Sequence, residues 1–427
     1  MSRILFSAVI YLLLPLLFLR LWLKGRQSPD YRKRWTERLG FFNAPANIEN
    51  GICFHCVSVG ETLAAIPLIK NTFEQFPELN ITVTTTTPTG SERVKAAFGD
   101  SVFHVYLPFD TPGAIKRFFA KVKPQLLVII ETELWPNLLH YARQYDCKTI
   151  LANARLSQKS ADGYRKITRL SRKMMKDVDL IAAHHQQDGE RFIQLGLEQH
   201  KLTVTGSIKF DMNIDADLIE KSQALKALWA GEGAANRPIW VVGSTHQGED
   251  ELILQAFKQI LTTIPNTLLV LVPRHPERFE QVAKLVETAK LSIIKRSDNI
   301  APTDATQVVL GDTMGELMLF WGISDVAFVG GSLVERGGHN PLEPAALSVP
   351  VLSGPHVFNF KAIYALLEQQ KAVIITPDPQ TLANSVIHLL QDKGARETLG
   401  NNGFVVVEEN RGALARLQSE ISKLLVK

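Results

Sequence analysis

The chain has 427 residues, of which 45% are hydrophobic and 21% are charged, and this composition excludes disordered and low-complexity proteins. The length predicts two or three domains. The net charge of +4 is unevenly distributed, because the first 43 residues carry +6 and the remainder carries −2. No basic field covers the body of the chain, so a general nucleic-acid-binding protein is disfavoured.

The first predicted element is an apolar helix at the N-terminus. Residues 4–19 contain no charge, and an apolar triplet at 21–23 extends the run. About 20 residues are needed to cross a bilayer, so the segment is marginal as a span. No small-residue cleavage site follows, which disfavours a signal peptide, and the basic residues at 20–38 predict a cytoplasmic location for the following chain. We therefore predict a membrane anchor over residues 1–26 that either spans the bilayer or lies in one leaflet. A buried core helix is the alternative.

Apolar runs then alternate with helical patterns, which is typical of parallel sheets covered by helices on both faces. The predicted strands of the first series are 51–58, 80–86, 102–106, 126–131, 148–152, 179–183 and 202–205. Those of the second series are 238–242, 268–272, 292–295, 307–310, 325–329, 350–352 and 372–376. The clearest helical stretches are 61–76, 113–122, 248–263, 276–289 and 379–392.

Two such series predict an α/β protein with two doubly wound Rossmann-like domains in tandem. We place the first domain at 27–215 and the second at 216–427, with a polar, irregular boundary region around 211–237. Ligands of such sheets bind outside the carboxyl ends of the strands, so a cleft between the two domains is the expected active site.

Cysteine usage indicates a reducing compartment, because three cysteines cannot form a disulfide framework. Cys53 and Cys56 form a C-x-x-C around His55. A metal or redox site is disfavoured there, because residues three apart on a strand point to opposite faces.

In the first half, three strand ends carry candidate catalytic residues. Residues 58–62 read SVGET, and Glu61 falls at a helix N-terminus, where it is placed either to accept a proton or simply to cap the helix. Residues 131–137 read ETELWPN; one of the carboxylates of Glu131 and Glu133 can orient a base or stabilise developing positive charge on a sugar, or the run is a capped helix start. Lys209 follows the last strand and is either an anion contact or a solvated linker residue.

In the second half, the candidate residues suit a phosphate and a sugar. Residues 243–249 (GSTHQGE) form a strand-to-helix turn that lacks the G-x-G-x-x-G and P-loop patterns. Arg274, in the run PRHP at 273–276, can contact phosphate or carboxylate. The densest motif is GGSLVERGGHNPLE at 330–343, where Asn340 is placed to cap a helix and leave its amides for an anion. Glu343 is placed to accept hydrogen bonds from ribose hydroxyls.

Together these motifs resemble a known family. The run at 330–343 looks like the nucleotide-sugar site of the two-Rossmann-domain "GT-B" glycosyltransferases. The apolar start followed by YRKRW at 31–35, together with SVGET, ETELWPN, PRHP and GHNPLE, resembles the 3-deoxy-D-manno-octulosonic acid (Kdo) transferases. The resemblance covers nearly the whole chain.

The resemblance implies a specific reaction at the cytoplasmic side of a bacterial inner membrane. CMP-Kdo is the implied donor, and a lipid A precursor, tetraacyl-disaccharide 4′-phosphate, is the implied acceptor in lipopolysaccharide biosynthesis. The transfer is inverting and uses neither a metal nor a cofactor. Glu61 is the implied general base, supported by Glu131 and Lys209. The implied CMP-binding residues are Pro273, Arg274, Met314, Gly315, Glu316, Asn340 and Glu343.

Two alternatives stay open at this point. One is another GT-B transferase that uses a different nucleotide sugar, such as a UDP sugar. The other is a membrane-attached adaptor that binds a nucleotide without turnover. Nucleic acid is not an expected partner.

Overall fold

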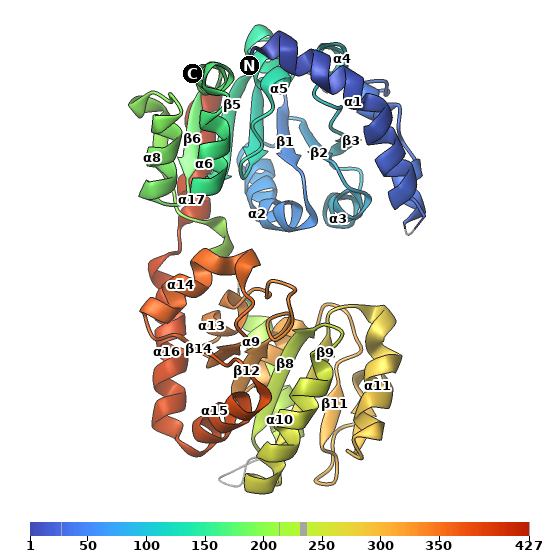
Figure 1. The fold of residues 1–427 in the computed structure, drawn as a ribbon, viewed down its shortest axis with the longest axis vertical. Coiled ribbons are helices and arrows are strands. Elements are labelled where there is room, and N and C mark those ends of the chain that lie inside the picture. The colour runs from blue at the N-terminus through green and yellow to red at the C-terminus, as the bar shows by residue number, and fades with distance from the viewer. Residues whose placement is uncertain (27, 213, 231–236, 427) are drawn as a thin grey trace. The chain divides into compact units, whose positions relative to one another are not determined.

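The computed structural model describes residues 1–26, 28–212, 214–230 and 237–426 (Figure 1). The chain divides into two units, one made of Met1–Asp211 with Arg411–Lys427 and the other of Met212–Asn410. The junction after residue 211 lies four residues from the predicted boundary. The end of the second domain differs from the prediction of 216–427, because the chain returns to the first unit at residue 411.

The first domain is built on a parallel sheet with the strand order β3-β2-β1-β4-β5-β6-β7 among its described residues. The strands are β1 (Ile52–Cys56), β2 (Ile81–Thr85), β3 (Phe103–Tyr106), β4 (Leu126–Ile130), β5 (Lys148–Ala154), β6 (Leu180–Ala183) and β7 (Leu202–Val204). Each overlaps a predicted strand. The central strands β1, β2 and β4 are buried on both faces, which is why the sequence shows apolar blocks there rather than alternation.

Helices cover both faces of this sheet. The first-domain helices are α1 (Arg3–Lys24), α2 (Val59–Gln75), α3 (Pro88–Phe98), α4 (Pro112–Val122), α5 (Pro136–Gln144), α6 (Gln158–Arg165), α7 (Thr168–Asp177), α8 (Gln186–Gln194) and α17 (Ala413–Val426). One core cluster joins the sheet to α4, α5, α7 and α8, and a second joins its other face to α2, α3 and α17. The two faces of the sheet therefore make separate apolar cores.

The C-terminal helix α17 belongs to the first domain because its apolar face completes the second of these cores, with Leu417 and Ile421 fully buried. The carboxylate of Asp211 accepts hydrogen bonds from the amides of Gly412 and Leu414, at 2.5 and 2.6 Å. These bonds satisfy amides at the start of the helix, which have no partner within it. In the sequence, α17 shows only an amphipathic pattern. Such a pattern predicts a helix with one buried face but does not predict which domain that face packs against.

The predicted anchor forms a single helix, α1, and its one buried residue is Ser7. Within the described residues it is the one helix long and apolar enough to cross a membrane. The alternative of a core helix is wrong, because most of its large apolar side chains are exposed.

The C-x-x-C motif lies on β1, and its geometry is that of a buried strand. Cys53 belongs to one core cluster and Cys56 to the cluster on the opposite face of the sheet, as the strand period requires. His55 between them is fully buried, and its Nδ1 lies 2.9 Å from the Thr84 hydroxyl. Burial lowers the pKa of His55 to about 4.

This histidine gives a prediction about acid stability. Between about pH 6.5 and pH 4 the unfolded chain binds a proton at His55 that the folded chain does not, so the free energy of unfolding falls as the pH falls through this window. In His55→Leu the slope should decrease by up to about 1.4 kcal/mol per pH unit. Urea unfolding at pH 7, 6 and 5 measures the slopes, and parallel slopes for the two proteins would contradict the assignment.

The second domain repeats the doubly wound plan, with the strand order β10-β11-β9-β8-β12-β13-β14 among its described residues. The strands are β8 (Ile239–Thr245), β9 (Leu268–Pro273), β10 (Ile293–Lys295), β11 (Val308–Leu310), β12 (Val326–Val329), β13 (Val351–Ser353) and β14 (Val373–Ile375). The helices are α9 (Ala216–Ala230), α10 (Asp250–Thr263), α11 (Phe279–Thr288), α12 (Leu317–Ile323), α13 (Leu342–Ala346), α14 (Lys361–Gln369), α15 (Pro379–Gln391) and α16 (Lys393–Glu409).

The predicted irregular stretch at 211–237 is wrong over most of its length, because α9 occupies Ala216–Ala230. Trp229 of α9 is 5% exposed and stacks on the fully buried Phe320 of α12, with 6.1 Å between the ring centroids. Charged residues interrupt the apolar pattern of α9, and for this reason the sequence did not predict the helix. Residues 213 and 231–236 of the predicted boundary region lie outside the described residues.

Candidate active site

The predicted site residues gather where each sheet reverses its strand order. In the first sheet the chain moves outward from β1 to β3 and then returns to β4 beside β1, and in the second sheet β12 returns beside β8. Such switch points open a crevice at the carboxyl ends of the strands. Glu61 follows β1 and Glu131 follows β4. Residues 243–249 cover the end of β8 and the turn after it, and residues 330–343 follow β12.

Glu61 lies in the first turn of α2 and is only 9% exposed. Its carboxylate accepts hydrogen bonds from the Val57 amide at 2.7 Å and from the Ser58 hydroxyl at 2.8 Å, while Ser58 caps the helix. The capping role offered as an alternative is therefore present. Burial and the nearby charge of Glu131 raise the pKa of Glu61, which makes its carboxylate a stronger base than an exposed glutamate. Capping and proton acceptance are compatible.

Glu131 pairs with Lys209, with 3.2 Å between Oε1 and Nζ. Glu131 adopts a positive φ of 61° immediately after β4, and its amide bonds to the Ala152 carbonyl. Lys209 comes from a 3-10 turn, η4 (Ile208–Phe210), far along the sheet from β4. The buried Asn153 holds this turn, because its Oδ1 accepts a hydrogen bond from the Ile208 amide at 3.1 Å. The structure thus brings all three predicted catalytic residues to one switch point.

Glu133 is a third carboxylate in this cluster. Burial and the charge of Glu61 raise the pKa of Glu133 to about 7. The sequence signalled it only as the second acid of the ETELWPN run. A group that is half protonated near neutral pH is suited to exchange protons with substrate, so Glu133 is the first substitute for Glu61 as a base.

In the second domain, Arg274, Asn340 and Glu343 form one polar group. The Arg274 amide bonds to the Thr245 carbonyl at 3.0 Å, which fixes the backbone of the exposed side chain. Glu343 accepts hydrogen bonds from the Trp321 indole and from the Asn340 amide, both at 3.3 Å. Burial raises the pKa of Glu343, and the positive charge of Arg274 opposes that rise. Arg274 therefore lies close enough to Glu343 for their charges to interact.

The other predicted nucleotide-binding residues are spread over the ends of two strands, β9 and β11. Pro273 is buried at the end of β9, and Met314 is 56% exposed in the turn after β11. Gly315 has a positive φ of 88°, so its backbone conformation favours glycine. Glu316 pairs with Arg296 at 2.9 Å.

The predicted helix start differs in the structure, because α13 (Leu342–Ala346) begins at Leu342 and its N-cap residue is Pro341, so Asn340 lies one residue before the cap. The Asn340 side chain accepts a hydrogen bond from the Leu342 amide at 3.2 Å, and α13 has only five residues. The amides of residues 331–333, earlier in the same run, are already bonded within the protein. All three donate to the buried Glu249, at 2.6, 2.9 and 2.9 Å.

Glu249 therefore holds the glycine-rich turn in place, and sequence reasoning missed this role. It is fully buried, and it also accepts a hydrogen bond from the His246 amide. Because a carboxylate accepts at both oxygens and an amide does not, Glu249→Gln should destabilise the second domain by about 1–3 kcal/mol. Urea unfolding measures the loss, and Glu251→Gln, an exposed change two residues along α10, is the matched control. Equal stability of the two variants would contradict this role.

Two histidines stack beside this turn. The Nε2 atoms of His246 and His339 lie 2.9 Å apart and their rings are parallel within 1°. Burial, together with the nearby charges of His275 and Arg274, lowers the pKa of each to about 4. The pair is neutral at neutral pH, with one ring donating to the other. An arriving anion would favour uptake of a proton by this pair.

Two doubly wound domains, with carboxylates at one switch point and a basic, glycine-rich turn at the other, define the GT-B class of glycosyltransferases. Comparison with solved structures shows the same fold. The UDP-GlcNAc 2-epimerase from Neisseria meningitidis aligns over 88% of this chain and 99% of its own, with 12% identity and a TM-score of 0.57. A glycosyltransferase from Rickettsia africae aligns over 89% and 99%, with 13% identity and a TM-score of 0.56.

Sequence comparison shows the family. Residues 33–212 match the model described as "3-Deoxy-D-manno-octulosonic-acid transferase (kdotransferase)", and residues 245–406 match "Glycosyl transferases group 1". The chain is 48% identical to the 3-deoxy-D-manno-octulosonic acid transferase of Haemophilus influenzae, over 98% of this chain and 97% of that one. It is 32% identical to the Bordetella pertussis enzyme over 97% and 98%. The protein is a glycosyltransferase and belongs to the Kdo transferase family.

Proposed function

We propose that the protein transfers Kdo from CMP-Kdo to a lipid A precursor, tetraacyl-disaccharide 4′-phosphate, with inversion at the anomeric carbon and without a metal. The observation that carries the proposal is the convergence of Glu61, Glu131 and Lys209 at the switch point of the first sheet. Family membership supports the sugar, because the relatives are Kdo transferases.

The proposed roles follow from the charges that change during transfer. An acceptor hydroxyl attacks the anomeric carbon and gives its proton to Glu61, while the bond from that carbon to the CMP phosphate breaks and the phosphate keeps the electron pair. The sugar ring gains oxocarbenium character, which the Glu131 carboxylate stabilises. Lys209 sets the position of Glu131 through their 3.2 Å contact and can also meet the Kdo carboxylate.

The second domain supplies the proposed CMP site. Arg274 makes a charge-assisted contact to the phosphate, and Glu343, oriented by Asn340 and Trp321, accepts from the ribose hydroxyls. Pro273, Met314, Gly315 and Glu316 complete the site in the proposal. For transfer, one acceptor and one donor must meet in a reactive orientation.

The proposed location is the cytoplasmic side of the bacterial inner membrane, with α1 as the attachment. The apolar, exposed helix and the basic residues that follow it support membrane attachment on that side. A membrane location also matches a lipid acceptor.

Nucleotide specificity tests the donor directly. Thermal-shift measurements should show that CMP stabilises the protein more than UDP or GDP at equal concentration. Stabilisation by UDP with none by CMP would favour a UDP-sugar transferase of the same fold. Transfer should persist in EDTA, and its loss there would contradict the metal-free mechanism.

A further inference from the structure

We propose that α1 lies flat in one leaflet with both of its ends on the cytoplasmic side, and that a basic face of α7 beside it binds anionic lipid headgroups. The proposal builds on the membrane attachment in the proposed function. It rests on contacts within the first domain.

One face of α1 packs against the domain along its whole length. Near its start, Arg3 donates to the Asn137 side chain at 2.8 Å, and the buried Ser7 hydroxyl lies 3.2 Å from the same atom. In the middle, the Tyr11 hydroxyl accepts a hydrogen bond from the Gly113 amide at 3.2 Å. The partners belong to α5 and α4, beside which α1 lies in Figure 1.

The far end of α1 packs against the same domain. Phe18 contacts the rings of Trp35 and Phe109, with centroids 5.2 and 5.4 Å apart. Arg32 donates to the Trp22 carbonyl at 3.2 Å. A helix that crosses the bilayer away from the domain must give up these contacts, including the buried pair of Ser7 and Asn137. Keeping both ends on one domain places both ends on one side of the membrane.

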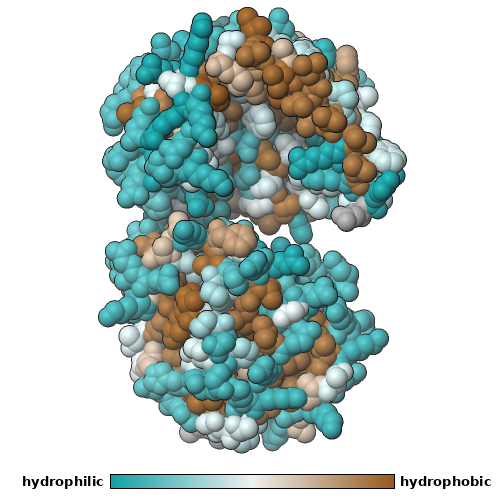
Figure 2. Space-filling view, viewed as in Figure 1, coloured by the Kyte–Doolittle hydropathy of each residue, from teal (hydrophilic) through white to brown (hydrophobic). Residues whose placement is uncertain are grey.

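The opposite face of α1 is apolar and exposed, and Figure 2 shows it as a hydrophobic band. Its most exposed large side chains include Ile4 at 77% and Leu12 at 79%. The others are Leu5, Val9, Leu13, Leu16, Leu19, Trp22 and Leu23. An apolar stripe of this length on a helix whose other face is docked fits the acyl region of a single leaflet.

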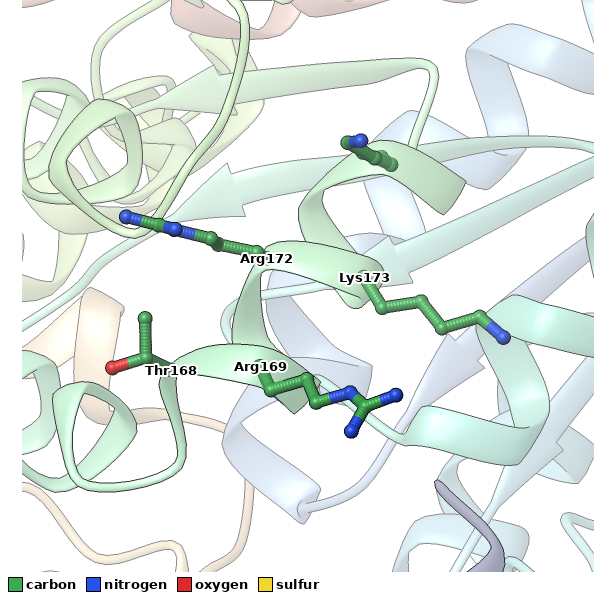
Figure 3. A pocket seen from close by; sticks show the side chains of 5 residues that line it. Thr168, Arg169, Arg172 and Lys173 are labelled. Carbon is green, nitrogen blue, oxygen red and sulfur yellow. The ribbon is translucent and has the colours of Figure 1, made fainter. Parts of the chain in front are cut away.

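The second observation is a basic face on α7, made of Arg169, Arg172, Lys173 and Lys176. These exposed side chains, with Thr168, line a pocket of about 580 Å³, and Figure 3 shows Arg169, Arg172 and Lys173 extending from the helix. None of the four takes part in a salt bridge with another described residue. Residues 159–176 hold seven basic side chains and one acidic one, a run that sequence reasoning passed over.

The α7 basic face lies near the start of α1. Arg3 of α1 lies over the Tyr141 ring of α5 at 5.5 Å, and α5 packs against α7. Lys116 of α4 lies over the same ring at 5.4 Å. Burial and the nearby charges of Arg3 and Lys173 lower the pKa of His140 on α5 to about 4, so both cations lie near this residue. Basic side chains next to an exposed apolar helix match a leaflet that has anionic headgroups around an acyl interior.

Labelling from each side of the membrane tests the position of α1. The three native cysteines are buried, so Ser2→Cys and Arg26→Cys add single reactive thiols at the two ends. We expect an impermeant maleimide to label both in inverted membrane vesicles and neither in spheroplasts, with Glu287→Cys of the second domain as the cytoplasmic reference. Labelling of Ser2→Cys in spheroplasts only would show a spanning helix and overturn the proposal.

A cross-link tests whether α1 stays docked while it is membrane-bound. In Ser7→Cys/Asn137→Cys, a disulfide should form in membranes under mild oxidation, because the native side chains touch. The control Leu12→Cys/Asn137→Cys places one thiol on the exposed face and should not cross-link. Equal cross-linking of the two pairs would contradict a docked helix.

Vesicle binding tests the α7 basic face. We expect Arg169→Gln/Arg172→Gln/Lys173→Gln to bind vesicles of phosphatidylcholine with phosphatidylglycerol roughly 10- to 100-fold more weakly than the parent protein, and neutral phosphatidylcholine vesicles equally. Lys258→Gln/Lys284→Gln/Lys290→Gln makes the same charge change on exposed residues of the second domain and is the control.

Equal binding of the two triple variants to anionic vesicles would overturn the headgroup role, and so would an equal loss on neutral vesicles. Melting curves establish that each variant is folded. Transfer to detergent-dispersed acceptor should be unchanged in the α7 variant. That result separates failure of this proposal from failure of the proposed function, because detergent removes the need for the bilayer surface.

Discussion

Glu61→Gln should lower the rate of Kdo transfer by roughly 10²- to 10⁴-fold, because the substitution keeps the size of the side chain and removes the proton acceptor. CMP affinity should be nearly unchanged, since the proposed CMP site lies in the other domain. The raised pKa of Glu61 also predicts that transfer by the parent protein falls, as the pH is lowered, before the ordinary glutamate pKa is reached. Single-turnover transfer, measured from pH 8 to pH 4, tests both the loss of rate in Glu61→Gln and the pH dependence of the parent protein.

The structure makes a control necessary, because Glu61 also accepts hydrogen bonds at the start of α2. Asp378→Asn is the matched change: Asp378 caps α15 and accepts a hydrogen bond from the Thr381 amide at 2.8 Å. Each substitution removes a negative charge at a helix N-terminus and should cost about 0.3–1 kcal/mol of stability. Only Glu61→Gln should lose transfer. Near-normal transfer by Glu61→Gln would remove Glu61 from the mechanism and make Glu133 or Glu131 the next candidate base.

Arg274→Ala should weaken CMP binding by roughly 10- to 100-fold through loss of a charge-assisted contact to phosphate. The exposed side chain makes no hydrogen bond or ion pair with another described residue, and its backbone bond to Thr245 survives the substitution. Folding should therefore be unaffected. Calorimetric titration with CMP measures the loss, and Lys284→Ala, an exposed change on α11, is the control.

Glu343→Ala extends this test to the ribose. It should weaken CMP while leaving the binding of inorganic phosphate unchanged, because Glu343 is proposed to meet only the sugar. Unchanged CMP affinity in both Arg274→Ala and Glu343→Ala would place the nucleotide elsewhere.

The parallel strands could be predicted from the sequence, because a strand that is buried on both faces has a continuous apolar run between polar turns. Their carboxyl ends then located the site: Glu61 and Glu131 follow neighbouring strands, β1 and β4. The sequence places Lys209 after the last strand of the first sheet, but it does not predict that Lys209 contacts Glu131. The contact depends on Asn153, whose side chain holds η4 across the sheet, and no local pattern encodes that bond.

The features that the sequence concealed depend on partners distant in the chain. The Glu249 carboxylate accepts hydrogen bonds from the amides of residues 331–333. A glycine-rich turn whose amides could bind an anion therefore already binds a carboxylate of the protein. Likewise α17 carries an ordinary amphipathic pattern, and only its contacts with α2 and β5 assign it to the first domain. Hydrophobic periodicity predicts that a face is buried but does not say against what.

The central claim is the transfer reaction, and mass spectrometry of its product tests it most directly. The full-length protein in detergent is incubated with CMP-Kdo and the tetraacyl-disaccharide 4′-phosphate acceptor, and parallel reactions contain a UDP sugar or the Glu61→Gln variant. We expect acceptor carrying Kdo and release of CMP with CMP-Kdo alone, and a greatly reduced yield with Glu61→Gln. Unmodified acceptor with CMP-Kdo, or transfer from the UDP sugar instead, would contradict the central claim.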